Sequence, residues 1–200
     1  MKHLFLLACA TLLFAFPARA AYIYSGLVDI PIPTDFTGVY IDIDNGTTSF
    51  SDFAGADINP FFGGSGIFTN ASFQPVRAGT NFDDPIVRLP SGTLVSAAST
   101  FSTGIGISGS PNNHMGISAS QFFPGTEGFF GFHFTKNDSS GPYYGWMRVV
   151  FTNGVPGGLI KDWVYDDNGA PIIVGAPEPG RSLLLLIGCV SLIHRRRRLA

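Results

Sequence analysis

The sequence predicts an all-β fold, an antiparallel two-sheet sandwich of jelly-roll type, and three observations support this prediction. Phe130, Phe132 and Phe134 alternate with glycine or histidine, which is the period of a half-buried strand. Glycine and proline separate short apolar stretches at intervals that suit antiparallel strands. Residues 21–175 contain no stretch that combines helical periodicity with helix-forming composition over three turns. A β-barrel is the alternative architecture.

Turn signals mark where the expected strands begin and end. Asn45-Gly46 is a strong hairpin signal. The turn-rich segment 137–142 connects the phenylalanine strand to the next one, and residues 156–158 (PGG) precede another. In chain order the expected strands are 22–32, 38–44, 48–53, 66–73, 86–89, 93–101, 130–134, 143–152, 159–165 and 171–174.

The first segment outside this domain is a secretory signal peptide at residues 1–20. Two basic side chains precede a short apolar core, which is followed by a small-residue cleavage motif formed by Ala18, Ala20 and Ala21. The shortness of the apolar core argues against a mature N-terminal helix. We therefore expect export, and a secreted domain that spans residues 21–175.

The second segment outside the domain is the C-terminal tail, residues 176–200. It combines an uncharged apolar run at 182–193 with a rigid polar motif before it, Pro177, Glu178 and Pro179, and four arginines after it, Arg195, Arg196, Arg197 and Arg198. A globular domain has no folding reason to end in this way, because the run would aggregate in water and adjacent arginines repel one another. In a membrane the run would enter the hydrocarbon as a short helix while the arginines stay cytoplasmic.

The order of these parts resembles the PEP-CTERM sorting signal of Gram-negative bacteria that produce exopolysaccharide. The resemblance implies that exosortase, an integral membrane transpeptidase, recognises Pro177, Glu178 and Pro179 and cuts the tail. It implies a cargo protein that is held transiently in the inner membrane and then reaches the cell surface or the extracellular space. The apolar run is shorter than an ordinary span. Its 12 residues would make a helix about 18 Å long, whereas most spans need roughly 20 residues. A plain tail anchor is the alternative interpretation.

Blocks within the domain resemble the region that precedes the tail in many PEP-CTERM proteins. They are residues 144–149 (YGWMRV), 160–165 (IKDWVY) and 169–172 (GAPI), with upstream blocks at 55–60 and 73–77. The family has no established activity to transfer, so this resemblance bears on class and destination alone. We expect the tryptophans of these blocks to be core residues rather than a ligand platform.

Composition argues against several classes of function. Residues 21–176 contain thirteen acidic and five basic side chains, a net charge of −8, which opposes nucleic-acid binding because phosphate requires positive charge. Cys9 and Cys189 both fall outside the domain, which therefore has no disulfide framework, thiolate nucleophile or cysteine-bound metal site. About 155 residues make one ordinary domain with room for a core.

The acidic stretch 42–46 (DIDNG) is the clearest candidate for a cation site. Oxygen ligands at alternate positions can converge on calcium. The EF-hand spacing is incomplete, however, because Asn45 directly follows Asp44 and Phe53 stands where a glutamate would close the loop. We therefore expect a hairpin turn here, no dedicated metal site and no cofactor, with weak calcium binding left open.

The sequence of the domain contains no pattern typical of catalysis. Glu127 is its only glutamate, so the glutamate-rich strand motif of sandwich glucanases is missing. His114 and His133 are its only histidines, and no G-x-S-x-G elbow is present. We therefore expect a protein that is not an enzyme.

Two non-enzymatic functions remain in contention. The first is a surface or extracellular-matrix protein that is sorted by its tail. The second is a carbohydrate-binding module that associates with extracellular polysaccharide. In such a module, exposed aromatic rings stack on sugars, and the candidates are Trp163, Tyr143 and Tyr165.

Overall fold

The domain is built of antiparallel strands, as predicted. The computed structural model describes residues 22–81, 84–101, 106–108, 122–152 and 157–176. These residues form thirteen strands, one short 3₁₀ helix, η1 (Phe62–Gly64), and no α-helix. A search of the same residues finds no helix with the length and apolar character needed to cross a membrane. The expected signal peptide and the expected apolar helix of the tail lie outside the described residues.

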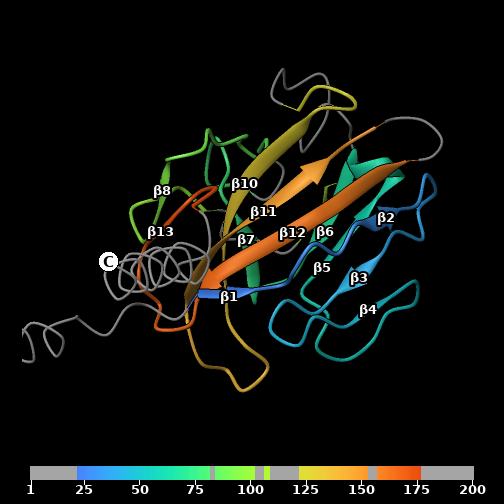
Figure 1. The fold of residues 1–200 in the computed structure, drawn as a ribbon. Coiled ribbons are helices and arrows are strands. Elements are labelled where there is room, and N and C mark those ends of the chain that lie inside the picture. The colour runs from blue at the N-terminus through green and yellow to red at the C-terminus, as the bar shows by residue number, and fades with distance from the viewer. Residues whose placement is uncertain (1–21, 82–83, 102–105, 109–121, 153–156, 177–200) are drawn as a thin grey trace, which may run out of the picture.

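A six-stranded sheet forms the centre of the molecule (Figure 1). Its three longest strands are neighbours in space and in sequence, and they pair through antiparallel ladders. The short strands β1 and β2 both pair with β12, at opposite ends of it. The strands of this sheet are β1 (Tyr22–Tyr24), β2 (Ile30–Ile32), β7 (Phe73–Pro75), β10 (Glu127–Phe134), β11 (Tyr143–Val150) and β12 (Gly158–Asp166).

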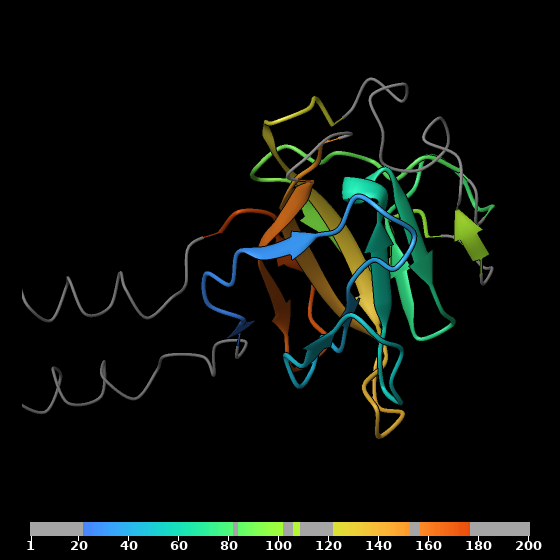
Figure 2. The same cartoon turned by 90° about the vertical axis from the view of Figure 1, so that its right-hand side faces the viewer.

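A second sheet of five strands faces the central sheet, so the domain is a two-layer sandwich (Figure 2). A two-stranded ribbon, β8 (Leu94–Val95) with β13 (Ile172–Ile173), packs on the opposite face of the central sheet. The order of the second sheet is β4 (Thr48–Ser49), β3 (Tyr40–Ile41), β5 (Ile58–Phe61), β6 (Gly66–Thr69) and β9 (Gly106–Ser108).

The central sheet has a hydrophobic core on each face. The larger core lies between the two sheets and contains Phe130, Phe132 and Phe134, as their alternation predicts. The second core joins the opposite face of the central sheet to the ribbon. Trp163 lies in the larger core and Trp146 in the second, 2% and 5% exposed, which confirms that both tryptophans are core residues.

Several strand boundaries differ from the prediction. The sequence predicts one strand over 22–32, but Gly26 and Asp29 adopt φ of 77° and 47° and divide it into β1 and β2. The stretch 86–89 makes isolated bridges rather than a strand. The strands β5 and β9 are not predicted at all. β5 contains Pro60, and proline within a run argues against a strand. Pro60 lacks an N–H but still accepts a hydrogen bond on the β3 side, because the Val39 N–H donates to its carbonyl at 3.0 Å.

Candidate functional site

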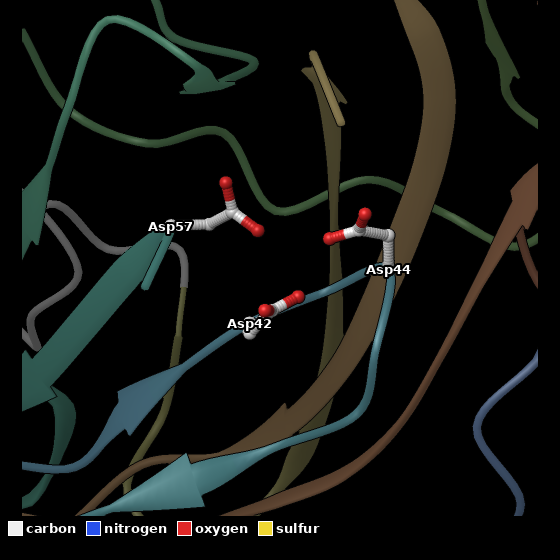
Figure 3. A group of neighbouring side chains, drawn as sticks. All are labelled: Asp42, Asp44 and Asp57. Carbon is white, nitrogen blue, oxygen red and sulfur yellow. The ribbon is translucent and has the colours of Figure 1, made fainter. Parts of the chain in front are cut away.

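Three carboxylates from two neighbouring strands converge at one end of the sandwich (Figure 3). Asp42 and Asp44 follow β3, and Asp57 directly precedes β5, its antiparallel neighbour. One oxygen from each carboxylate lies within 4.8 Å of the others. Asp42 and Asp57 are 4% and 3% exposed, whereas Asp44 is partly exposed. We refer to these three residues as the acidic triad.

The β3–β4 hairpin positions the first two members of the triad. The Asp42 N–H donates to the Thr47 carbonyl at 2.9 Å, and the Gly46 N–H donates to the Asp42 carbonyl at 2.9 Å. Gly46 has φ of 68°, a left-handed conformation that glycine adopts without strain. The Asn45 N–H donates to the Asp42 carboxylate at 3.0 Å. The predicted hairpin turn is therefore confirmed, and it fixes the Asp42 side chain.

Hydrogen bonds from other segments hold the triad together. The Ile43 N–H and the Ser72 hydroxyl each donate to one oxygen of Asp57, both at 2.9 Å. Asn137, in the loop between β10 and β11, donates its side-chain amide to Asp42 at 2.9 Å. Segments that are far apart in the sequence thus meet at this end of the sandwich.

Burial and mutual repulsion change the acidity of the triad. Burial raises the pKa of Asp57 to about 6, and the negative charges of Asp42 and Asp44 add to the increase, while hydrogen bonds from Ser72 and the backbone oppose it. Burial also raises the pKa of Asp44, and so does the neighbouring Asp42. Burial acts in the same direction on Asp42, but hydrogen bonds from Asp44 and two asparagines outweigh it and lower that pKa. The triad therefore keeps a proton to a higher pH than three separate aspartates would.

The triad provides ligands for a hard cation without completing a coordination shell. Calcium takes about six to eight oxygens, whereas three carboxylates converge here, and each already accepts hydrogen bonds from the protein. Acid–base catalysis by Asp57 requires a substrate within hydrogen-bond reach, and a side chain that is 3% exposed offers no such approach. The arrangement suits a shared proton or a weakly held cation.

Two of the three aromatic candidates for glycan binding are in the core. Trp163 and Tyr165 are 2% and 3% exposed, and the Trp163 indole N–H donates to the Ile43 carbonyl at 3.2 Å. Stacking on a sugar requires an exposed ring face, so these two rings cannot provide the predicted platform. Tyr143 is partly buried, and the Lys136 Nζ lies 4.6 Å from its ring centroid. One face of the Tyr143 ring is therefore occupied.

The remaining candidate residues lie either in the central sheet or outside the described residues. His133 lies on the face of β10 opposite the three phenylalanines, where burial lowers its pKa. The Glu127 carboxylate is largely exposed and lies 3.4 Å from the Arg148 guanidinium. The signal-cleavage residues, His114, the sorting motif 177–179 and the arginines of the tail lie outside the described residues.

Comparison with known proteins adds no family assignment. No family model, curated protein or solved structure significantly matches this chain. The function proposed below therefore depends on the sequence features of the two ends and on the geometry of the domain.

The sequence pattern indicates Asp42 and Asp44 as a cation candidate but does not point to Asp57, Ser72 or Asn137. Asp57 approaches the other two because β3 and β5 are paired through Ile41 and Ile58. An antiparallel pairing of residues 38–44 with 57–61 is the signal that would have placed Asp57 beside Asp42. The sequence does not reveal that pairing, because Pro60 argues against a strand at residues 58–61.

Proposed function

We propose that this protein is an exported, non-enzymatic surface or extracellular-matrix protein that is sorted and processed through a PEP-CTERM-like tail. Exosortase is the proposed processing partner, and the protein is proposed to be held transiently in the inner membrane before it is cut. The two packed sheets are proposed to have jelly-roll connectivity. Glycan binding is not proposed as a second function, because Trp163 and Tyr165 are buried.

The position of the two ends of the described chain carries this proposal. β1 and the segment after β13 both lie on the left side of the molecule in Figure 2. The described strands all lie between them: Tyr22 pairs with Asp166 in the central sheet, and Val174 is fully buried in the second core. Removal of a leader and a tail would therefore leave every described strand in place. A tail held in a membrane would keep this one side of the domain toward the bilayer.

The chemistry of the tail supports a processed signal. Pro177 and Pro179 each restrict φ to about −65°, which favours an extended motif that presents Glu178 outside the membrane. The terminal arginines resist translocation, so the apolar run pauses in the bilayer with its N-terminal end outward. The shortness of that run favours a transient signal over a permanent anchor.

Glu178→Ala tests this proposal. In a host with exosortase, this variant should be exported but not cut, and it should remain bound to the membrane. Glu127→Ala, which removes an exposed glutamate of the domain, is the matched control and should be processed like the wild type. Intact-mass analysis of the surface form gives the result. A wild-type chain that still ends at Ala200 would reduce the tail to an anchor and contradict the proposal.

A further inference from the structure

One surface of the domain is free of charge and lies where the tail begins. On the ribbon, Leu94 and Ile173 are register partners and are 55% and 45% exposed. The segments that form and flank the ribbon, 89–101 and 168–176, contain no acidic or basic residue. We refer to the exposed surface of these two segments as the neutral face. It is unusual in a domain whose net charge is −8.

The ribbon is fixed to the domain with this face outward. The Val174 N–H donates to the Thr93 carbonyl at 2.9 Å, and the Gly92 N–H donates to the Val174 carbonyl at 2.9 Å. Side chains alternate along a strand, so neighbours of the buried residues must point away from the core. The inward side chains of the ribbon segment are Val95, Ile172 and Val174, which pack with Tyr144, Trp146 and Val164 of the central sheet.

The tail leaves the domain directly from this ribbon. The Ala176 N–H donates to the Ile173 carbonyl at 3.2 Å, so the last described residue is still bonded to β13. Residues 177–181 separate it from the apolar run, so Ala176 and Ser182 can be at most about 22 Å apart. If the run lies in the bilayer, as the proposed function requires, Ala176 stays within that distance of the lipid surface and holds the neighbouring neutral face near it.

Electrostatics distinguish this face from the rest of the domain. Bacterial and other anionic lipid surfaces repel acidic protein surfaces, and the repulsion acts over about 8 Å at physiological ionic strength. A face without charged groups avoids this repulsion and presents apolar side chains to the interface. The nearest charged neighbours in sequence, Arg88 and Asp167, stand at its borders.

We propose that the neutral face docks on the surface of the phospholipid bilayer while the tail is inserted, with Leu94 and Ile173 in contact with the lipid. This inference depends on the proposed function of the tail. Two half-exposed side chains bind weakly by themselves, but a short tether gives an effective concentration of about a millimolar or more, so a weak contact is sufficient. Docking would hold the motif 177–179 at a constant distance from the membrane surface, within reach of a membrane-embedded enzyme.

Lipid-borne quenching of single labelled cysteines tests the docking. The full-length chain carries Cys9→Ser and Cys189→Ser, and a cysteine with an environment-sensitive fluorophore replaces Leu94, Ile173 or Phe50. Phe50 is the matched control, because it is 57% exposed but follows β4 in the other sheet. A fourth variant keeps Cys189, within the apolar run, and reports insertion of the tail. The vesicles contain phosphatidylethanolamine, phosphatidylglycerol and a quencher-bearing lipid, with the quencher near the headgroup for positions 50, 94 and 173 and on the acyl chain for position 189.

The proposal expects loss of most fluorescence at positions 94, 173 and 189, with little change at 50. Quenching at 189 without quenching at 94 and 173 would overturn the docking and leave the membrane role of the tail intact. No quenching at 189 would overturn both. Labels at 94 and 173 that move to an apolar environment without lipid quenching would show that protein covers the face, which also overturns the proposal.

A charge introduced on the neutral face provides a second test. Leu94→Asp should weaken quenching of a label at Ile173, because it places a negative charge against an anionic surface. Phe50→Asp, an equally exposed position in the other sheet, should leave that quenching unchanged. Equal quenching in both variants would contradict the proposal.

Discussion

Asp57 is a carboxyl group whose folded environment favours its protonated form. Its pKa is raised from 3.8 to about 6. The folded chain therefore binds this proton more tightly than the unfolded chain does. As the pH rises from about 4 to about 6, ionisation of Asp57 lowers the free energy of unfolding, and below about 4 this cost is absent. Two pKa units correspond to about 3 kcal/mol, an upper figure for the cost at neutral pH.

Asp57→Asn should therefore stabilise the protein in metal-free buffer at neutral pH. The amide is neutral, and its oxygen can still accept the hydrogen bond from the Ile43 N–H. We expect the free energy of unfolding to rise by about 1–3 kcal/mol at pH 7 and to change little at pH 4. Urea unfolding at several pH values measures both. Asp52→Asn removes an exposed charge and is the control. Destabilisation at pH 7 would show that ionised Asp57 is well accommodated.

Calcium should bind the acidic triad weakly if it binds at all. Three carboxylates are too few to fill a calcium shell, and each already accepts hydrogen bonds from the protein. Titration calorimetry at pH 8 should give a dissociation constant no tighter than about 10⁻⁴ M. The variant with both Asp42→Asn and Asp44→Asn separates binding at the triad from binding elsewhere. Micromolar affinity that this variant loses would contradict the expectation.

At the residue scale, the sequence predicts what is local. The turn at Asn45-Gly46 and the inward phenylalanines of β10 follow from short patterns, and the structure confirms them. The position of Asp57 depends on a pairing between strands, and the burial of Tyr165 depends on how two sheets pack. A short window of sequence determines neither property.

At the scale of elements, Gly145 shows why β11 and its neighbours pack closely. In the structure this glycine lies within an extended ladder, and the reason for glycine is space. A Cβ at this position would lie 2.3 Å from the Phe132 ring and 2.6 Å from the Val164 carbonyl oxygen.

Gly145→Ala should destabilise the domain, because neither the ring nor the backbone carbonyl can move away freely. Overpacking of this kind typically costs about 1–3 kcal/mol. Gly46→Asn is the control, because a Cβ at position 46 would meet no atom within 4 Å and asparagine tolerates positive φ. Thermal and urea unfolding of the two variants give the comparison. Equal stability of Gly145→Ala and the wild type would mean that the Phe132 ring has room to shift.

The long strands were predictable from the sequence because each has its own periodic pattern. β10, β11 and β12 follow their expected stretches to within a few residues. The unpredicted strands β5 and β9 are short. β5 is a strand because it pairs with β3 and β6 on its two sides, and β9 because it pairs with β6 at the edge of the sheet. Their hydrogen bonds are supplied by tertiary structure rather than by local propensity.

At the scale of the whole molecule, the second core explains how a domain without cysteine closes both faces of its central sheet. The ribbon and its flanking segments cover the face that carries Trp146 and Tyr144. Gly131 lies under this cover, where a Cβ would approach the Val95 side chain to 2.6 Å. The same ribbon presents the neutral face, so one element both completes the core and marks the side from which the tail leaves.

The stability of the domain should not depend on redox conditions. Cys9 and Cys189 are the only cysteines, and both lie outside residues 21–175. The melting temperature of the purified domain should therefore be the same with and without dithiothreitol. A variant with Leu94→Cys and Ile173→Cys is the positive control, because these register partners on adjacent strands can form a disulfide that constrains the unfolded chain. Reductant should lower the melting temperature of that variant alone. The surface form purified from a host with exosortase should behave like the domain, and a shift of several degrees in that form would show that a cysteine-bearing end is retained, which contradicts the assignment of both ends as removable segments.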